Sequence, residues 1–201
     1  SPGCTKQKSP KMTEQEKQEQ EVKEEKSQAQ LDYEAGQEFL KNLEPAQAAN
    51  AFHNALIAFE LEGNENGVAN AADKLGDICA KRGDVATAMS HYDRVYAICQ
   101  KHTDRFSLFS IEKKKAKLMY DAKEYDQAIR LYNEVLDEYG ALRDPQGSVD
   151  TLETLAEIYL IKGEKSRAAD AYRTIAAIHT SFKHSRHAEK FLQKAEETEK
   201  G

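Results

Sequence analysis

The amino-acid sequence predicts an all-α protein, an elongated solenoid of four helical hairpins with a C-terminal capping helix. Three observations support this expectation. A pattern of small and apolar residues recurs four times at a spacing of forty residues, without insertion or deletion. Each copy holds two stretches of helical periodicity with a short turn between them. Only four of the 201 residues are Pro, and 39% are hydrophobic, which suits amphipathic helices stacked into one domain.

The repeated pattern is clearest in the second helical stretch of each copy. A small residue is followed four and seven positions later by aromatic or apolar residues, so that the three share one helical face. The four sets are Ala48, Phe52, Ala55; Ala88, Tyr92, Val95; Ala128, Tyr132, Val135; and Ala168, Tyr172, Ile175. A small residue at a fixed place on this face predicts a closely crossing neighbour helix.

The first helical stretch of each copy follows the same spacing. Small residues stand twelve positions before each alanine, at Gly36, Gly76, Ala116 and Ala156. We expect hairpins near 29–61, 69–100, 109–139 and 149–180, without strands. Gly83 and Gly163 suit the positive φ of a helix exit, and Pro45 suits a first helical turn. Loops between hairpins are expected at 62–67 and 143–148, which contain Gly, Asn or Pro.

These residues resemble the tetratricopeptide repeat (TPR), and the stretch "LGDICAKRGDVATAMSHYDRV" carries the likeness most fully. The resemblance extends over roughly residues 29–182 and implies repeats near 29–68, 69–108, 109–148 and 149–182. The period of forty residues exceeds the usual length of about 34. Six extra residues in each unit therefore lengthen either the helices or the linkers.

The two ends of the chain differ from the repeats. Residues 1–28 are rich in Glu, Lys and Gln and contain few large apolar residues, so we expect a charged tether, flexible or partly helical. A partner-binding helix is the alternative. The remaining 29–201 form the TPR domain, with a capping helix at 184–200 whose apolar stripe is Ala188, Phe191, Leu192 and Ala195. Such a cap covers the apolar end of the last repeat.

Cys4 follows Gly3 and precedes the polar tether, which resembles the processed start of a bacterial lipoprotein. That resemblance implies lipid attachment at Cys4, a membrane tether and a location on the periplasmic side of the bacterial envelope. A Cys4 without a role, in a cytoplasmic protein, is the alternative. Cys79 and Cys99 are expected to be buried and too far apart for a disulfide, because antiparallel packing separates them.

The sequence offers no motif for catalysis, so we expect no enzyme and no cofactor. His179, His184 and His187 lie close together in the sequence, and His184 and His187 could share a helix face, but a solvated stretch at the cap is favoured over a metal site. The formal net charge of −6 argues against binding nucleic acid.

The resemblance implies that ligands bind in the concave groove lined by the first helix of each repeat. The positions carried over are Asn70, Asp73, Lys74, Asp77, Lys81, Lys113, Lys114, Lys117, Tyr120, Glu153 and Glu157. This groove is expected to be basic in its middle and acidic in its last repeat, and to bind an acidic segment. Lys190 and Lys194 are expected outside it. A solvated lysine face is the competing interpretation.

The favoured function is a non-enzymatic scaffold or adaptor that binds a protein or peptide in the groove. The alternative is a structural assembly subunit, such as a lipoprotein component of a secretion, pilus or envelope complex. Such a subunit would pack through its repeats, against copies of itself or against the other components of that complex.

Overall fold

The computed structural model describes residues 10–201, and within them the chain forms ten α-helices and no β-strand. The helices are α1 (Glu14–Glu24), α2 (Gln28–Lys41), α3 (Pro45–Glu62), α4 (Glu65–Lys81), α5 (Val85–Lys101), α6 (Arg105–Asp121), α7 (Tyr125–Ala141), α8 (Pro145–Ile161), α9 (Lys165–Ser181) and α10 (Ser185–Lys200). The predicted all-α fold class is confirmed.

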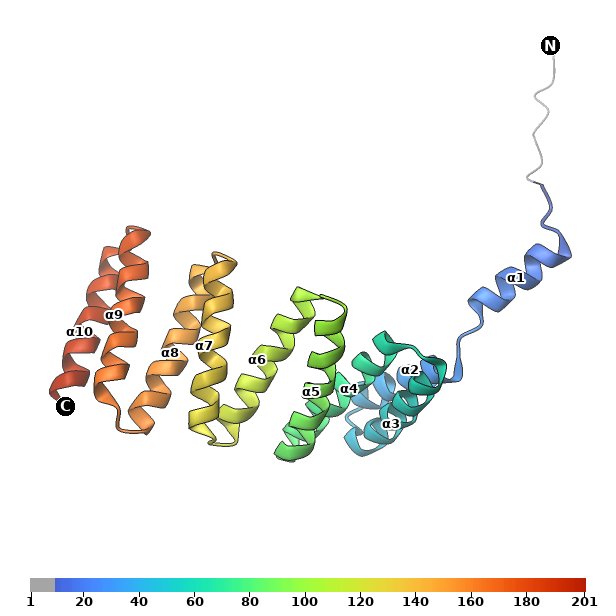
Figure 1. Cartoon of the computed structure of the whole chain (residues 1–201), viewed down its shortest axis with the longest axis horizontal. Helices are drawn as coiled ribbons and strands as arrows, with labels where there is room; N and C mark the ends of the chain where they lie inside the picture. The colour runs from blue at the N-terminus through green and yellow to red at the C-terminus, as the bar shows by residue number, and fades with distance from the viewer. Residues whose placement is uncertain (1–9) are drawn as a thin grey trace, which may run out of the picture.

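The helices from α2 to α10 pack in chain order, each mainly against the helix before it and the helix after it. Figure 1 shows the resulting elongated array, with the C-terminal helix α10 at one end and α1 projecting away from the other. The pairs α2/α3, α4/α5, α6/α7 and α8/α9 are the four hairpins, and α10 covers α9. This arrangement places every first helix of a hairpin, α2, α4, α6 and α8, in one row.

The connections between helices are shorter than expected. Most of the stretches predicted as loops at 62–67 and 143–148 are helical, because α4 begins at Glu65 and α8 at Pro145. The side chains of Asn64 and Asp144 cap these helices by accepting hydrogen bonds of 2.9 Å from the backbone N–H group of the third residue of each helix. The extra residues of the long repeat therefore lengthen the helices and leave connections of two or three residues.

The turns inside the hairpins follow the expected chemistry. Gly83 and Gly163 have φ values of +78° and +76°, and Pro45 stands in the first turn of α3. After α4, the N–H of Asp84 donates to the carbonyl of Cys79, which closes the helix end. These predictions are confirmed, and the equivalent position in the first hairpin carries Leu43 with a φ of +60°.

Close helix crossings explain the small residues of the repeat. Ala48, Ala88, Ala128 and Ala168 are fully buried. A Cβ atom on Gly36 would lie 2.7 Å from the ring of Phe52, and one on Gly76 would lie 2.5 Å from the ring of Tyr92. In these two hairpins the aromatic residue of the second helix therefore packs onto the backbone of the first helix.

A second set of close contacts, not predicted, joins one hairpin to the next. A Cβ atom on Gly67 would lie 2.3 Å from the Phe59 ring, and one on Gly147 would lie 2.3 Å from the Tyr139 ring. These glycines stand where the loops were expected, but they lie in the first turns of α4 and α8. Their role is close packing rather than turn formation.

Most of the buried hydrophobic residues of the described chain form two clusters. One buried cluster comprises residues of α2 to α7 together with Ile158, and a second comprises residues of α8 to α10. Ser148 and Thr151, near the start of α8, are the two buried polar side chains of the described chain, and they lie near this division. In α10, Ala188, Phe191 and Ala195 are buried as predicted, whereas Leu192 is 51% exposed.

The segment before the repeats is partly helical. A reciprocal pair of hydrogen bonds between Thr13 and Glu16 caps α1, and the residues of this helix whose side chains are described are exposed. Cys4 lies outside the described residues. Cys79 and Cys99 are buried and unbonded, as predicted. No helix in the described part of the chain is long and apolar enough to cross a membrane.

Candidate functional site

Three depressions follow one another along the row of first helices, and together we call them the groove. The turn pocket, of about 450 Å³, lies between the α2–α3 turn and α4, and its lining includes Leu40, Lys74 and Lys81. The middle pocket, of about 340 Å³, lies between α4 and α6. The acidic pocket, of about 380 Å³, lies on α8 and carries Asp150, Glu153 and Glu157.

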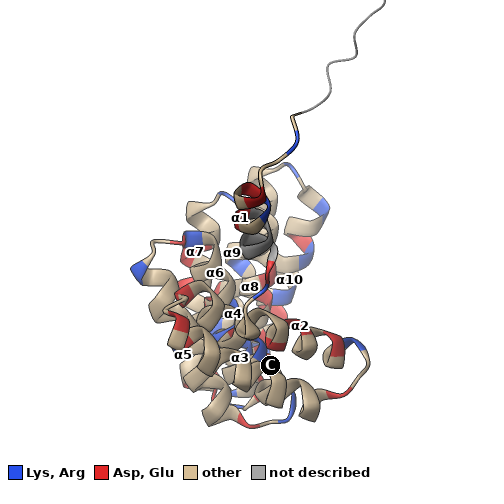
Figure 2. Cartoon of the chain, turned by 90° about the vertical axis from the view of Figure 1, so that its right-hand side faces the viewer, with Lys and Arg blue, Asp and Glu red and all other residues tan. Residues whose placement is uncertain are grey.

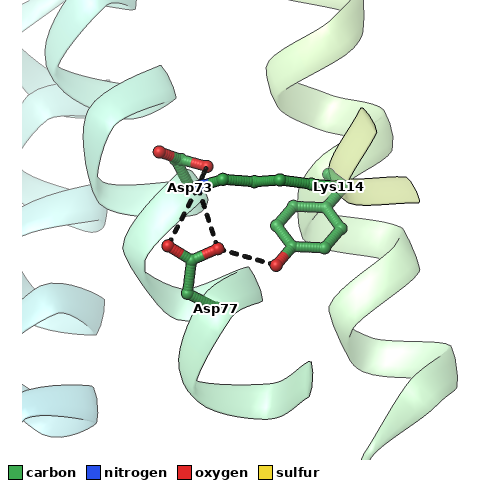
Figure 3. Close-up of polar contacts among 4 residues, drawn as sticks. Asp73, Asp77 and Lys114 are labelled. Carbon is green, nitrogen blue, oxygen red and sulfur yellow. Dashed lines mark hydrogen bonds and ion pairs between the residues drawn. The ribbon is translucent and has the colours of Figure 1, made fainter. Parts of the chain in front are cut away.

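Lys114 of α6 is the centre of an ion-pair network that joins two hairpins (Figure 3). Its Nζ donates to Asp73 Oδ1 at 2.8 Å and to both Asp77 carboxylate oxygens at 3.0 Å. Both aspartates stand on α4, and the hydroxyl of Tyr92 on α5 donates to Asp77 Oδ1 at 2.7 Å. Four side chains from three helices are therefore held together across the groove.

The pKa values in this network reflect the competition between burial and pairing. Burial disfavours the Lys114 ammonium, but its hydrogen bonds to Asp73 and Asp77 outweigh this and raise its pKa. Burial and the hydrogen bond to Asp77 raise the pKa of Tyr92. The network thus keeps Lys114 charged and Tyr92 neutral, and it ties α4, α5 and α6 together.

The other lysines of α6 are also engaged. Lys117 Nζ lies 2.8 Å from Asp121 Oδ2, and Lys115 Nζ lies 2.7 Å from Asp93 Oδ1. Lys113 Nζ lies 4.5 Å from the centre of the Phe109 ring on the same helix and 5.9 Å from the centre of the Tyr139 ring on α7. Around the middle pocket, Asp73, Asp77 and Asp121 therefore balance the charges of Lys114 and Lys117, which the sequence predicted as part of a basic patch.

The acidic pocket keeps its predicted character. Glu157 accepts a hydrogen bond of 2.7 Å from the hydroxyl of Tyr120, while no ion pair of Glu153 occurs among the described residues. Lys194 of α10 also lines this pocket, with its Nζ 4.8 Å from the centre of the Tyr172 ring. The expectation that Lys194 lies outside the groove is wrong, because α10 folds over the end of the last hairpin.

The turn pocket has an apolar lining with a basic rim. Leu40, Leu43, Pro45 and Ile78 line it together with the cations Lys74, Lys81 and Arg82. None of these three cations forms an ion pair within the described part of the chain. Asn70 is exposed on α4 beyond the three pockets. The groove consequently has a basic end at α4, a neutral middle and an acidic end at α8.

The remaining charged and metal-ligating groups do not form a second centre. In the view of Figure 2, basic and acidic residues are interspersed over the helices instead of gathering into one field. No group of three His, Cys, Asp or Glu among the described residues is arranged to hold a metal ion. His179 and His187 instead stack with ring centres 5.1 Å apart, where α9 meets α10.

Several groove residues escaped the sequence analysis. Tyr92, Tyr172 and Lys194 come from helices that the repeat resemblance does not assign to the groove. Leu43, in the α2–α3 turn, is a further lining residue that was not predicted. Its signal was a large apolar residue at the position where two other hairpins carry Gly83 and Gly163.

Comparisons with known proteins identify the chain by its repeats. A family model described as soluble NSF attachment protein, SNAP, matches residues 11–143, and a tetratricopeptide repeat model matches residues 113–181. No curated protein sequence matches the chain. The SNAP model covers well over half of the chain.

Solved structures share the fold at low sequence identity. A putative kinesin light chain with nearly identical TPR-like repeats from Podosopora anserina superposes with a TM-score of 0.59 at 13% identity, covering 87% of this chain and 97% of that one. The apo form of RapI gives a TM-score of 0.70 at 14% identity, covering 91% of this chain but only 53% of RapI. Aspartyl phosphate phosphatase F from Bacillus subtilis gives 0.54 at 14% identity, with coverage of 88% and 51%.

The structural matches establish the fold alone, and neither matching family model describes an enzyme. The matched residues run from the tether through most of the repeats, and the repeat model takes in the last two hairpins. The predicted TPR resemblance is confirmed. This chain is a tetratricopeptide-repeat protein that belongs to the soluble NSF attachment protein family.

Proposed function

We propose that this protein is a non-enzymatic scaffold that binds a segment of another protein along the groove from α4 to α8. The observation that carries the proposal is the charge separation of the groove. Lys74, Lys81 and Arg82 stand at one end, and Asp150 and Glu153 at the other, while the charges between them neutralise one another. Unpaired charges of opposite sign at the two ends favour a partner with complementary charges in a fixed direction.

The length of the groove favours a polypeptide ligand. Its two ends lie on different hairpins, with the turn pocket beside α4 and the acidic pocket on α8. A ligand that contacts both ends must therefore be elongated, as an extended segment of polypeptide is. The middle of the groove adds shape and apolar contact, since Ala80, Tyr92 and Leu118 line it between the paired charges.

The comparisons suggest which partner to test first. The family is described as one of NSF attachment proteins, so NSF is the first candidate. A Rap protein with a TM-score of 0.55 and 16% identity to this chain has been solved in complex with Competence and Sporulation Factor. The same class of fold therefore serves for binding in that protein.

A charge-swap variant tests the proposal without changing the net charge. Lys81→Glu combined with Glu153→Lys reverses both ends of the groove, and Glu189→Lys with Lys190→Glu makes the matched swap on the exposed side of α10. We expect the groove swap to weaken binding of purified NSF, measured by calorimetry, at least tenfold and the α10 swap to change it less than twofold.

A crosslinking experiment extends the test to partners other than NSF. A photo-reactive residue at Glu153 should crosslink the partner in an extract of the source cells, whereas one at Asp137, exposed on α7, should not. Equal crosslinking from both positions, with equal binding by both swaps, would contradict groove binding. Crosslinks between copies of this chain would instead support the assembly role.

A further inference from the structure

We infer that the turn pocket is a distinct docking site for an acidic peptide segment that carries a large apolar side chain. This inference rests on the proposed scaffold function and names the partner chemistry at one end of the groove. Two independent observations point to it, the unusual state of Leu43 and the composition of the pocket beside it.

Leu43 is unusual both in its backbone conformation and in the exposure of its side chain. Its φ of +60° lies in the left-handed region, where a large side chain is unfavourable, and its side chain is 86% exposed. The equivalent turn positions in other hairpins carry Gly83, Lys123 and Gly163. Leu43 is thus the apolar exception among them, and neither helix propensity nor core burial accounts for it.

The pocket beside Leu43 supplies matching apolar surface. Leu40, Pro45 and Ile78 line it with Leu43 in a volume of about 450 Å³, which is large enough for one or two apolar side chains. A leucine or phenylalanine inserted there would leave water on contact with four apolar residues. Leu43 would then be covered by the ligand rather than by the protein's own core.

The charged residues at the rim of the turn pocket favour a ligand with negative charges beside its apolar side chain. Lys74, Lys81 and Arg82 converge on it without an ion pair in the described part of the chain. The single carboxylate of the lining, Asp77, is already committed to Lys114 and Tyr92. Three free cations around an apolar pocket complement carboxylates placed next to an apolar side chain.

The probe for this site is the capped hexapeptide Asp-Asp-Leu-Leu-Asp-Asp, titrated into the isotope-labelled full chain while backbone amide shifts are recorded by NMR. We expect saturable shifts confined to the α2–α3 turn and the end of α4, including Leu43 and Ile78, that weaken with salt. Capped Lys-Lys-Leu-Leu-Lys-Lys and Asp-Asp-Ser-Ser-Asp-Asp test the charge and the apolar requirement separately. Equal shifts from either control peptide, or no saturable shifts from the probe, would overturn the inference.

A pair of turn variants separates binding from folding. Leu43→Gly removes the side chain at a position where glycine is favoured, so thermal stability should be kept or raised while affinity for the probe falls at least fivefold. Lys123→Gly makes the same backbone change in the α6–α7 turn and should leave probe affinity unchanged. Undiminished binding by Leu43→Gly would refute the role of Leu43.

The two proposals fail in different ways. Shifts that appear at the acidic pocket or in the middle pocket would overturn the turn-pocket site but leave groove binding intact. Groove binding itself fails on the charge-swap and crosslinking results, which do not depend on the hexapeptide.

Discussion

The contact of Gly76 with Tyr92 offers a direct test of the close packing inside a hairpin. In Gly76→Ala the new Cβ atom would lie 2.5 Å and 2.6 Å from two ring atoms of Tyr92, about 1 Å inside ordinary contact. The ring has little room to retreat, because it is 3% exposed and its hydroxyl is bonded to Asp77.

Three contributions determine how far Gly76→Ala changes the free energy of unfolding. Overpacking of this kind costs about 1–3 kcal/mol, and a weakened hydrogen bond to the Asp77 carboxylate adds about 1 kcal/mol. Replacing Gly by Ala inside a helix returns about 0.5–1 kcal/mol. We therefore expect Gly76→Ala to lower the free energy of unfolding by about 1–3.5 kcal/mol.

Gly140→Ala is the matched control, because no atom outside its own helix lies within 4 Å of a Cβ built there. It should stabilise α7 by up to about 1 kcal/mol through helix propensity alone. Urea unfolding followed by circular dichroism at a helical wavelength measures both variants. If Gly76→Ala is as stable as Gly140→Ala, the small residues of the repeat do not mark close crossings.

Three further outcomes are expected. Ala128→Leu, at a fully buried crossing, should cost about 1–3 kcal/mol by urea unfolding, whereas Ala86→Leu on the exposed face of α5 should stay within about 0.5 kcal/mol. Lys114→Met leaves the carboxylates of Asp73 and Asp77 facing each other without a cation between them. It should lower the free energy of unfolding by about 1–2 kcal/mol, between the values for exposed and buried ion pairs. An unchanged melting temperature would argue against the network. Burial raises the pKa of Tyr132 from 10.0 to about 12. As the pH rises, the Tyr132 hydroxyl therefore loses its proton in the unfolded chain before it does so in the folded one, and the free energy of unfolding falls between pH 10 and 12. In thermal melts over this range, Tyr132→Phe should reduce the loss of stability.

The fold could be predicted from the repeat pattern, because that pattern depends on local sterics. A helix can cross another closely only where a side chain is small, so Gly36, Gly76 and the four buried alanines fixed the pairing of helices. Helix boundaries were placed less well. Gly67 and Gly147 are residue types typical of loops, and loops were predicted there. The side chains of Asn64 and Asp144 instead cap α4 and α8, so that both helices begin before these glycines.

The electrostatic character of the groove could not be predicted from the repeat pattern, because it depends on side-chain contacts between hairpins. The repeat spacing aligned Lys114 with Lys74, which suggested a basic patch, but the Lys114 ammonium instead reaches Asp73 and Asp77 on the neighbouring hairpin. The repeat determines which backbone positions align between hairpins. A lysine side chain, however, is long and flexible enough for its ammonium to reach residues one helical turn away from the aligned position. Because the Lys114 ammonium is partly buried, pairing with a carboxylate is strongly favoured, since a charge removed from water needs a partner of opposite sign.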